Sequence, residues 1–430
     1  MKIQNVKGGY DFLPKEQRIR NYVSDTLKKV FEEYGYKSIE TPIICYYDIL
    51  SDKYDEENDI LKEIYRLKDQ GNRELGLRYD LTVPFAKFIA LNKNNLSFPF
   101  KRYEIAKVFR DGPVKVGRDR EFTQCDVDVV GIKGELIEAE LLSIYEKAFR
   151  LMNIDIVIKY NSRNLMTGLI LECGISLEDV PKITTIIDKK DKLSKEDMDN
   201  YLLEGGLSEN QVVRINRYFD MGLSDLIDEF KETENEKIKI GLKEIENLNR
   251  YLNGIKIDGI CEFSSTLARG QNYYTGNVFE VYEKNGKIAC SIGAGGRYDK
   301  IIGNFINDGN NYPTVGISFG LSSIYELLKD SDLFNEKSQT DIYIIPLNTE
   351  IESLSLANKL RDFGYSVEIE MTSKRIKKSL DFANKEKIPY TIVLGEDEVE
   401  RGEFNIKNMF NGKKYKIKFS DLSKLKELIG

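Results

Sequence analysis

Apolar positions near the start of the chain recur with the spacing of a helix. Over residues 14–34, six apolar or aromatic side chains fall on one helical face, and Pro14 stands at a natural helix start. The next stretch, "GYKSIETPII", predicts a strand over residues 35–44. Residues 63–80 and 102–131 each hold two extended runs around glycine-rich turns, which is typical of antiparallel hairpins. The pattern predicts an α+β domain built around an antiparallel sheet.

The pattern changes in the middle of the chain. Residues 176–252 are charged, poor in strand-forming runs and spaced as helices, so they predict a helical insertion. Strand character then returns in three segments, 277–283, 287–299 and 314–320. An amphipathic helix over residues 321–330 and a polar link, "SDLFNEKSQT", follow. We therefore expect a first domain over residues 1–330.

The last ninety residues alternate regularly between strand and helix. Strands are expected at 341–347, 365–370 and 390–395, with helices at 350–363 and 374–387 between them. Two further strand-like runs, "FNIKNMF" and "KKYKIKF", complete the chain. Such alternation predicts a small α/β domain with a mostly parallel sheet over residues 338–430.

Composition narrows the chemistry that is available. The 430 residues include no histidine, so Ser-His-Asp hydrolysis, Cys-His catalysis and histidine-ligated metals are excluded. A net charge of -7 argues against bulk electrostatic attachment to nucleic acid, although a local basic face can still bind it. Any catalysis must depend on fixed charges and on positioning.

Cysteine usage and hydropathy indicate the type of protein and its compartment. The five cysteines lie far apart without a CxxC pair, so we predict neither disulfides nor a metal site made by protein side chains. No apolar run approaches the roughly 20 residues of a membrane span. The start, "MKIQNVKGGYDFLPKE", lacks the apolar centre of a secretory signal. We expect a cytoplasmic protein that does not bind membranes.

One predicted hairpin concentrates polar side chains. Its first strand carries Arg110, and its loop carries Lys115 and Arg118. Its return strand places three polar residues on one face at period two, Gln124, Asp126 and Asp128. For any one of them, a solvated face or a ladder of ion pairs is an equally good explanation. The set as a whole favours a binding site.

Two other segments are ambiguous on their own. In "GLRYDLTVPFAKF", Asp80 and Thr82 stand at a strand end before a helix, where they suit either a ligand or a plain helix cap. The glycine-rich "GAGGRYD" suits either a hairpin turn or a backbone that approaches a ligand closely. Neither segment decides the function alone.

Together these segments resemble the histidyl-tRNA synthetases of class II. "LARGQNYYTGNVFEV" and "GGRYD" are similar to that family's two histidine-specific motifs, and "VFRDGPVKVGRDREFTQCDVDVVG" is similar to the class motif 2 hairpin. "LRYDLTVPFAKF" matches the family's amino-acid site, and residues 341–430 resemble its anticodon-binding domain. The resemblance implies a class II catalytic domain with an antiparallel sheet, a helical insertion and a C-terminal α/β anticodon-binding domain.

The resemblance also implies roles at the amino-acid site. Arg269 matches the catalytic arginine, which contacts the amino-acid carboxylate and the α-phosphate of ATP. Tyr274, beside Tyr273, matches the hydroxyl that contacts the imidazole ring, and Asp128 matches the acidic partner of the other ring nitrogen. Three residues match those that hold the α-amino group, Asp80, Thr82 and Gln124.

At the nucleotide, the resemblance assigns Arg110 to the α-phosphate, Arg118 to a position beside ATP and Phe122 to stacking on adenine. The implied activity joins L-histidine to tRNA(His), with ATP and Mg²⁺, in a homodimer formed through residues 14–44. No protein imidazole is required, because a carboxylate is already a nucleophile at neutral pH. Arginines and Mg²⁺ stabilise the charge that gathers on the phosphate.

One departure from the family keeps a second function open. Class II motif 3 usually carries an arginine that packs on adenine, and Ser323 stands at that position here. Non-catalytic paralogues resemble the catalytic domain and act as the histidine-sensing regulatory subunit of ATP phosphoribosyltransferase. Those paralogues generally lack the anticodon-binding domain and the catalytic arginine. This chain keeps residues 341–430 and Arg269, which favours the synthetase.

Overall fold

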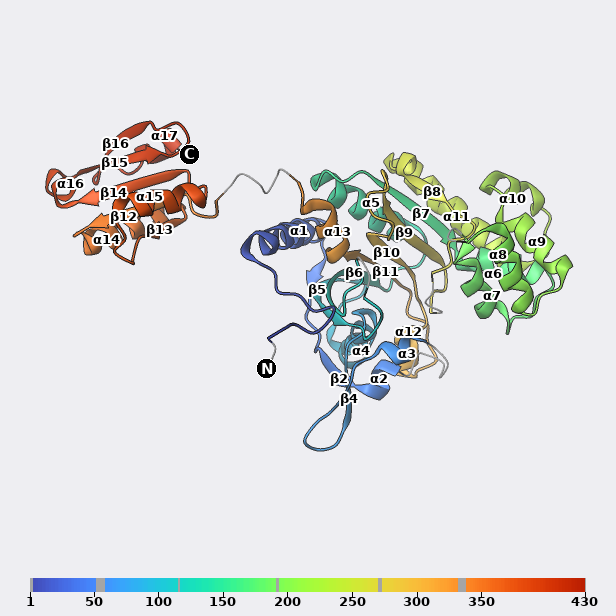
Figure 1. The fold of residues 1–430 in the computed structure, drawn as a ribbon. Coiled ribbons are helices and arrows are strands. Elements are labelled where there is room, and N and C mark those ends of the chain that lie inside the picture. The colour runs from blue at the N-terminus through green and yellow to red at the C-terminus, as the bar shows by residue number, and fades with distance from the viewer. Residues whose placement is uncertain are drawn as a thin grey trace. The chain divides into compact units, whose positions relative to one another are not determined.

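The structure is a computed structural model that describes residues 3–51, 59–114, 117–190, 193–269, 273–331 and 338–429. The chain divides into two compact units, Met1–Asp330 and Ser331–Gly430, whose elements are labelled in Figure 1. Within the described ranges, no helix combines the length and the apolar character that crossing a membrane requires.

An eight-stranded sheet runs through the first unit in the order β1-β5-β6-β11-β10-β9-β7-β8. Its strands are β1 (Lys37–Ser38), β5 (Phe100–Phe109), β6 (Glu121–Val130), β7 (Ile156–Ser162), β8 (Cys261–Phe263), β9 (Asn277–Glu283), β10 (Gly293–Arg297) and β11 (Thr314–Gly320). The inner neighbours pair antiparallel, whereas the edge strands β1 and β8 run parallel to β5 and β7. The predicted antiparallel sheet is confirmed, with two parallel edges added.

The helix predicted at the start of the chain is confirmed as α1 (Pro14–Glu33). Its buried positions include Ile19, Val23, Leu27 and Phe31, which recur every three or four residues. Pro14 occupies the first helical position, where its missing N–H costs no hydrogen bond.

Aromatic packing joins this helix to one face of the sheet. Phe319 of β11 lies among the rings of Phe31, Tyr145 and Phe149, with centroid separations of 5.7, 4.6 and 5.4 Å. Two of these rings belong to α5 (Leu136–Leu151), which packs beside α1. Because side chains alternate along a strand, Ser318 points to the other face of the sheet. That other face carries the polar residues described below.

The predicted strand over residues 35–44 is wrong as a single element. The chain pairs with the main sheet only at β1 and with a separate three-stranded sheet at β2 (Ile44–Tyr46). Between them Pro42 has no N–H to donate, and the backbone N–H of Thr41 donates to the buried carboxylate of Glu104 at 2.9 Å. The smaller sheet is completed by β3 (Arg66–Lys68) and β4 (Glu74–Leu77).

The segment predicted as a helical insertion consists of helices in the part of it that the structure describes. They are α7 (Val180–Ile187), α8 (Lys195–Glu204), α9 (Glu209–Phe219), α10 (Leu223–Glu229) and α11 (Glu236–Ile255). With α6 (Arg163–Glu172) they gather beside the β7–β8 end of the sheet (Figure 1). The other helices of this unit are α2 (Tyr47–Ser51), α3 (Asp59–Glu63), α4 (Thr82–Asn92), α12 (Ile301–Ile306) and α13 (Leu321–Leu328).

The second unit contains a five-stranded sheet in the order β13-β12-β14-β15-β16. Its elements are β12 (Ile342–Leu347), α14 (Glu350–Asp362), β13 (Val367–Ile369), α15 (Ile376–Lys385), β14 (Tyr390–Gly395), α16 (Glu396–Arg401), β15 (Glu403–Asn408), β16 (Lys414–Lys418) and α17 (Lys424–Ile429). The α/β class is confirmed, but the prediction of a mostly parallel sheet is wrong. Two of the four pairings are antiparallel, because the six-residue helix α16 before β15 and the short turn before β16 are shorter than the crossover of a dozen or more residues that a parallel pairing requires.

Candidate active site

Two cavities of the first unit are lined by polar side chains. The larger, of about 380 Å³, lies where the helical segment meets the chain that follows β8. The smaller, of about 110 Å³, lies on the polar face of the eight-stranded sheet. Eight of the ten residues that the resemblance singles out line the smaller cavity, namely Asp80, Thr82, Arg110, Gln124, Asp128, Arg269, Tyr273 and Tyr274.

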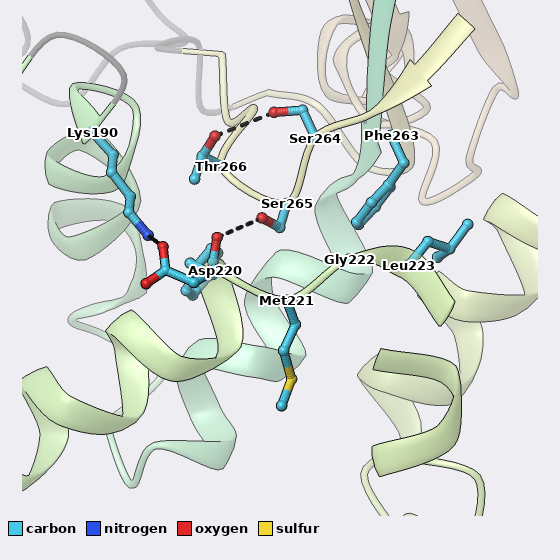
Figure 2. A pocket seen from close by; sticks show the side chains of 10 residues that line it. Lys190, Asp220, Met221, Gly222, Leu223, Phe263, Ser264, Ser265 and Thr266 are labelled. Atoms are coloured by element: carbon cyan, nitrogen blue, oxygen red, sulfur yellow. Dashed lines mark hydrogen bonds and ion pairs between the residues drawn. The ribbon is translucent and has the colours of Figure 1, made fainter. Parts of the chain in front are cut away.

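The polar groups of the larger cavity bond to one another, as Figure 2 shows. Lys190 and Asp220 form an ion pair of 2.6 Å, and the hydroxyls of Ser264 and Thr266 share a hydrogen bond of 3.2 Å. Ser265 donates to a backbone oxygen at the end of α9 at 2.8 Å. Among the described residues, none that lines this cavity has a buried side-chain polar atom without a hydrogen-bond partner. The larger cavity therefore gives no sign of a catalytic site.

The smaller cavity has the opposite character. Within the described ranges, five of its buried side-chain atoms lack a hydrogen-bond partner, Asp80 Oδ2, Gln124 Oε1, Asp126 Oδ1, Asp128 Oδ2 and Arg269 Nε, although Asp128 Oδ2 forms an ion pair with Arg102. Buried polar groups in native proteins are nearly always paired. Three acceptors and one donor without partners around one cavity indicate a polar ligand with both donors and acceptors.

Strand β6 supplies one wall of this cavity. Gln124, Asp126 and Asp128 lie on the same face of the strand, as the period-two spacing predicts. Across β11, the Ser318 hydroxyl accepts from Gln124 Nε2 at 3.3 Å and bonds to the Asp126 carboxylate. Asp126 and Asp128 are each only 4% exposed, so a solvated face is excluded for them.

Asp128 is held by two partners that the sequence analysis did not single out. Arg102 lies 2.6 Å from Asp128 through Nη2, and the Tyr298 hydroxyl donates to the other carboxylate oxygen. Arg102 is completely buried, with its guanidinium 4.2 Å from the ring centroid of Phe85. Burial raises the pKa of Asp128, and Arg102 opposes that rise. Asp128 is therefore held in place as a hydrogen-bond acceptor, and the positive charge of Arg102 balances its negative charge.

Asp80 combines both of the roles that its sequence allowed. Its Oδ1 accepts from the backbone N–H of Val83 at 3.0 Å, which caps the first turn of α4. Its Oδ2 has no partner in the described structure and belongs to the cavity wall. Thr82, the first residue of α4, lines the same wall. Capping the helix thus fixes the direction of the second oxygen.

Arg269 enters the cavity from the loop before β9, with a left-handed backbone at φ 58°. Its Nη1 forms an ion pair of 2.5 Å with Glu280, whose other oxygen accepts from the Tyr282 hydroxyl. Burial alone would lower the pKa of Arg269, but Tyr274 and Glu280 raise it above its ordinary value. The guanidinium remains charged and is anchored on one side only.

The glycine-rich "GAGG" segment forms strand β10, so the alternative of a hairpin turn is wrong. A side chain at Gly296, whose φ is 157°, would come within 2.8 Å of the Tyr274 ring. The Tyr274 and Tyr273 rings lie 4.8 Å apart, and Tyr273 meets Tyr298 edge-on at 5.9 Å. The glycine therefore makes room for the tyrosines of the cavity, and the close approach of this backbone to a ligand stays a prediction.

Only some of the residues predicted to bind the nucleotide line this cavity. Arg110 lines it, with its guanidinium 4.2 Å from the ring centroid of Tyr79 and 4.8 Å from that of Phe122. Phe122 and Arg118 do not line it, and Arg118 is exposed. Lys115 lies outside the described residues. Phe122 therefore packs against Arg110, and its stacking on adenine stays a prediction.

Ser323 is part of a packed contact and does not line the cavity. It is 6% exposed, and its Oγ lies 3.6 Å from the sulfur of Cys290. A side chain added at Gly117, in the motif 2 loop, would meet the same two residues at 3.4 and 3.1 Å. An arginine at position 323 would displace these neighbours. The residues around Ser323 therefore pack closely against its small side chain, where the usual motif 3 arginine would displace them.

Three residues of the site were missed at the level of sequence: Arg102, Glu280 and Tyr298. Arg102 and Glu104 are charged residues at period two, on the same face of strand β5, which was the available signal. Glu280 is likewise a charged residue inside a strand-like run, "NVFEVYE". Their partners come from distant segments, so spacing alone does not reveal the pairs.

Asp126 has an unusual protonation equilibrium. Burial raises the pKa of Asp126 to about 8, with Asp128 and Asp80 adding to the rise and Arg102 opposing it. Charged and titratable groups face it from β5, β6, β11 and the surrounding loops: Arg102, Glu104, Cys125, Asp128, Ser318, Asp80, Tyr145, Tyr274 and Tyr298. Without a ligand, the folded protein favours a neutral Asp126 at neutral pH.

Asp126→Asn is therefore expected to stabilise the fold increasingly as the pH rises. The folded-state pKa lies above the ordinary value of about 4, so the stability gained from protonation is complete below that value. This stabilisation is lost as the pH rises towards 8. The asparagine of the variant does not ionise, so the variant loses no stability in this way. Thermal denaturation at about pH 5, 7 and 8.5 measures the difference in melting temperature between variant and wild type. A difference that does not change with pH would show that Asp126 is ionised in the fold.

The fold and the cavity together define the class. A largely antiparallel sheet carries a long β5–β6 hairpin and a β11–α13 strand-helix unit, and its polar face holds the cavity. This is the catalytic domain of a class II aminoacyl-tRNA synthetase. The model described as "Histidyl-tRNA synthetase" matches residues 8–324, and "Anticodon binding domain" matches residues 341–427. The chain belongs to the histidyl-tRNA synthetase family.

Individual relatives agree with this assignment. "Histidine--tRNA ligase 1" of Bacillus cereus (strain ZK / E33L) is 45% identical over 425 residues, which cover 98% of this chain and 99% of the relative. "Histidine--tRNA ligase" of Cytophaga hutchinsonii is 35% identical and covers 97% of each chain. The histidyl-tRNA synthetase structure from Nostoc sp. PCC 7120 superposes with a TM-score of 0.85 at 29% identity, covering 100% of this chain and 99% of that one.

A fourth similarity concerns the fold alone. A Bacillus halodurans structure described as an "ATP phosphoribosyltransferase regulatory subunit/histidyl-tRNA synthetase" has a TM-score of 0.77 at 19% identity and covers 92% of this chain. At that identity the likeness does not discriminate between the two functions. The family and the two-part fold predicted from the motifs are confirmed.

Proposed function

We propose that this protein activates L-histidine with ATP to histidyl-adenylate and transfers the histidyl group to tRNA(His). The observation that carries the proposal is the small cavity, in which buried acceptors and the Nε of the charged Arg269 guanidinium lack hydrogen-bond partners in the described structure. The ammonium group of an amino acid donates to these acceptors, and its carboxylate pairs with the guanidinium. The 45% identity to a histidine--tRNA ligase over nearly the whole chain supports the choice of amino acid.

In this proposal, residues at different ends of the cavity contact different groups of the histidine substrate. Asp80, Thr82 and Gln124 receive the α-ammonium group, and Arg269 receives the carboxylate. Tyr274 and Asp128 hydrogen-bond to the two nitrogens of the imidazole ring. Asp128 suits that task because Arg102 and Tyr298 fix it as an acceptor. A site built to pair both ring nitrogens rejects analogues that leave them unpaired by roughly 10⁴–10⁵-fold.

The first chemical step follows from charge and position. A carboxylate oxygen of histidine attacks the α-phosphorus of ATP, the bond to the β-phosphate breaks, and pyrophosphate leaves. Negative charge gathers on the α-phosphoryl oxygens, where Arg269 and Arg110 donate. Mg²⁺ enters with ATP as part of the substrate and neutralises its phosphates. No side chain has to remove a proton, which is consistent with a chain that lacks histidine.

In the second step, a terminal ribose hydroxyl of the tRNA attacks the carbonyl carbon of the adenylate, and AMP leaves. The hydroxyl proton passes to a phosphate oxygen of the adenylate itself. The second unit is assigned to the anticodon, because residues 341–427 match an anticodon-binding domain. Both substrates place the reaction in the cytoplasm.

The proposed enzyme is a homodimer through the region of residues 14–44. Around the small sheet, four large apolar side chains are between 38% and 54% exposed, Ile43, Ile44, Tyr46 and Leu67. Such a cluster of exposed apolar residues is typical of an interface. Sedimentation at micromolar concentration tests this part of the proposal, and a monomer would contradict it.

Gly316→Ala is expected to weaken histidine binding without unfolding the protein. Gly316 pairs with Asp128 across β6 and β11, and an added Cβ would lie 1.8 Å from Asp128 Oδ1. The carboxylate must move away from its ligand, which costs a charged hydrogen bond, or about 10- to 100-fold in affinity. Calorimetric titration with L-histidine measures the change. Gly259→Ala, where nothing lies within 4 Å, is the matched control and should bind normally.

Aminoacylation tests the proposed function directly. Purified protein supplied with ATP, Mg²⁺, L-histidine and tRNA(His) is expected to form acid-stable histidyl-tRNA, and the other nineteen amino acids should give no product. If the protein binds histidine but charges no tRNA under these conditions, the alternative of a histidine-sensing regulatory subunit replaces the synthetase.

A further inference from the structure

The α-ammonium group of an amino acid has three N–H donors. Apart from Asp128 Oδ2, which forms an ion pair with Arg102, the cavity presents three buried acceptor oxygens that lack hydrogen-bond partners in the described structure, on Asp80, Gln124 and Asp126. The family resemblance accounts for the first and second but gives no role to Asp126. A buried carboxylate oxygen without a donor is costly, so its retention calls for a ligand.

The position of Asp126 places it beside one of the other two acceptors. The Ser318 hydroxyl accepts from Gln124 Nε2 at 3.3 Å and bonds to the Asp126 carboxylate, so a single hydroxyl links the two side chains. Asp126 Oδ1 is buried without a hydrogen-bond partner in the described structure, and Asp126 lines the cavity. A purely structural role in holding Ser318 would not explain this unpaired oxygen.

Charge around Asp126 also favours a cation. Its nearest basic group is Arg102, which is already 2.6 Å from Asp128 and 3.6 Å from Glu104. Asp80 and Asp128 add further negative charge. The positive charge of an ammonium group offsets this excess of negative charge. A charge-assisted hydrogen bond is also about twice as strong as a neutral one.

We propose that the Asp126 carboxylate is a further acceptor for the α-ammonium group of the substrate, beside Asp80, Thr82 and Gln124, and that it selects a free amino acid over an analogue without this group. The assignment rests on the proposed function, in which the substrate is L-histidine. It also explains why the fold retains a carboxyl group whose ionisation is unfavourable in the absence of ligand. Binding of the ammonium group then shifts Asp126 to its charged form.

The test is a thermodynamic cycle with two ligands and one variant. L-histidine and imidazole-4-propionic acid, which lacks only the α-amino group, are titrated calorimetrically into wild-type protein and Asp126→Asn. We expect the variant to bind L-histidine about 10- to 100-fold more weakly, the usual cost of one hydrogen bond to a charged group. Its affinity for the deaminated analogue should stay within about twofold of wild type.

Asp128→Asn is the matched control, because it changes a carboxylate two residues along the same strand. It should weaken both ligands alike, since both carry the imidazole ring. If Asp126→Asn also weakens both ligands equally, Asp126 acts on the ring or on the fold, and the assignment is overturned. If it weakens neither, the assignment is overturned as well.

A second measurement on the unaltered protein keeps the test independent of the variant's folding. Titration at about pH 5, where the imidazole rings of both ligands are protonated before binding, in two buffers of different ionisation enthalpy reports the protons released on binding. L-histidine should release more protons than the deaminated analogue, because only its ammonium group ionises Asp126. Equal release for both ligands would contradict the assignment. Failure of wild-type protein to bind L-histidine at all would instead contradict the proposed function.

Discussion

Arg269→Ala is expected to slow adenylate formation by about 10²–10³-fold while histidine affinity falls far less. The guanidinium is anchored to Glu280 through Nη1 at 2.5 Å, and its Nε is buried without a partner in the described structure. In the proposed mechanism, its contact to the α-phosphate strengthens as negative charge develops there. An interaction that is stronger in the transition state than in the ground state acts on turnover more than on binding.

The effect is measured by separating the two quantities. Histidine-dependent exchange of pyrophosphate into ATP gives the rate, and calorimetric titration gives the affinity of each protein for L-histidine. Arg250→Ala is the matched control, because this exposed residue of α11 contacts only the neighbouring Tyr251 among the contacts described for it. Equal losses in rate and in affinity would mean that Arg269 binds the amino acid without stabilising the transition state.

A chain that ends at Asp330 is expected to retain adenylate formation and to lose most of its tRNA charging. The first unit is compact by itself, and the second has a separate core that includes Ile344, Leu360 and Phe404. Removing a second binding module that is linked to the first costs roughly 10²-fold or more in effective affinity. Pyrophosphate exchange should remain within about twofold of the full chain, because the residues of the cavity all lie before position 330.

A shortened RNA provides the control for this truncation. A minihelix that contains only the acceptor arm of tRNA(His) should be charged equally by both proteins, because it offers no anticodon. Lysines of the segment 374–387, such as Lys377 and Lys378, are exposed and supply positive charge for the full tRNA. If the truncated chain charges full tRNA(His) normally, the assignment of the second unit to the anticodon is wrong.

Local patterns predicted those parts of the fold and site that depend on local spacing. The face of α1 follows from apolar residues at helical intervals, and the wall formed by Gln124 and Asp128 follows from alternation along one strand. Both depend on one segment at a time. The family motifs added Asp80 and Arg269, which lie far apart in sequence and meet at one cavity.

Features that depend on contacts between distant segments were not predictable in the same way. Arg102 becomes a partner of Asp128 only when β5 pairs with β6, and Glu280 meets Arg269 only when the loop folds back on β9. Likewise, the strand predicted over 35–44 breaks because Thr41 bonds to Glu104 on another strand. Spacing within a segment carries no information about such partners.

The most direct test of the account is histidine-dependent exchange of pyrophosphate into ATP by the purified full chain. With Mg²⁺ and saturating ATP, the account predicts exchange that requires L-histidine, with Arg110 and Arg269 both essential and Ser323 in place of the motif 3 arginine. Exchange should be absent with imidazole-4-propionic acid, which lacks the α-amino group. A folded protein that binds L-histidine and yet catalyses no exchange at any ATP concentration would contradict the account.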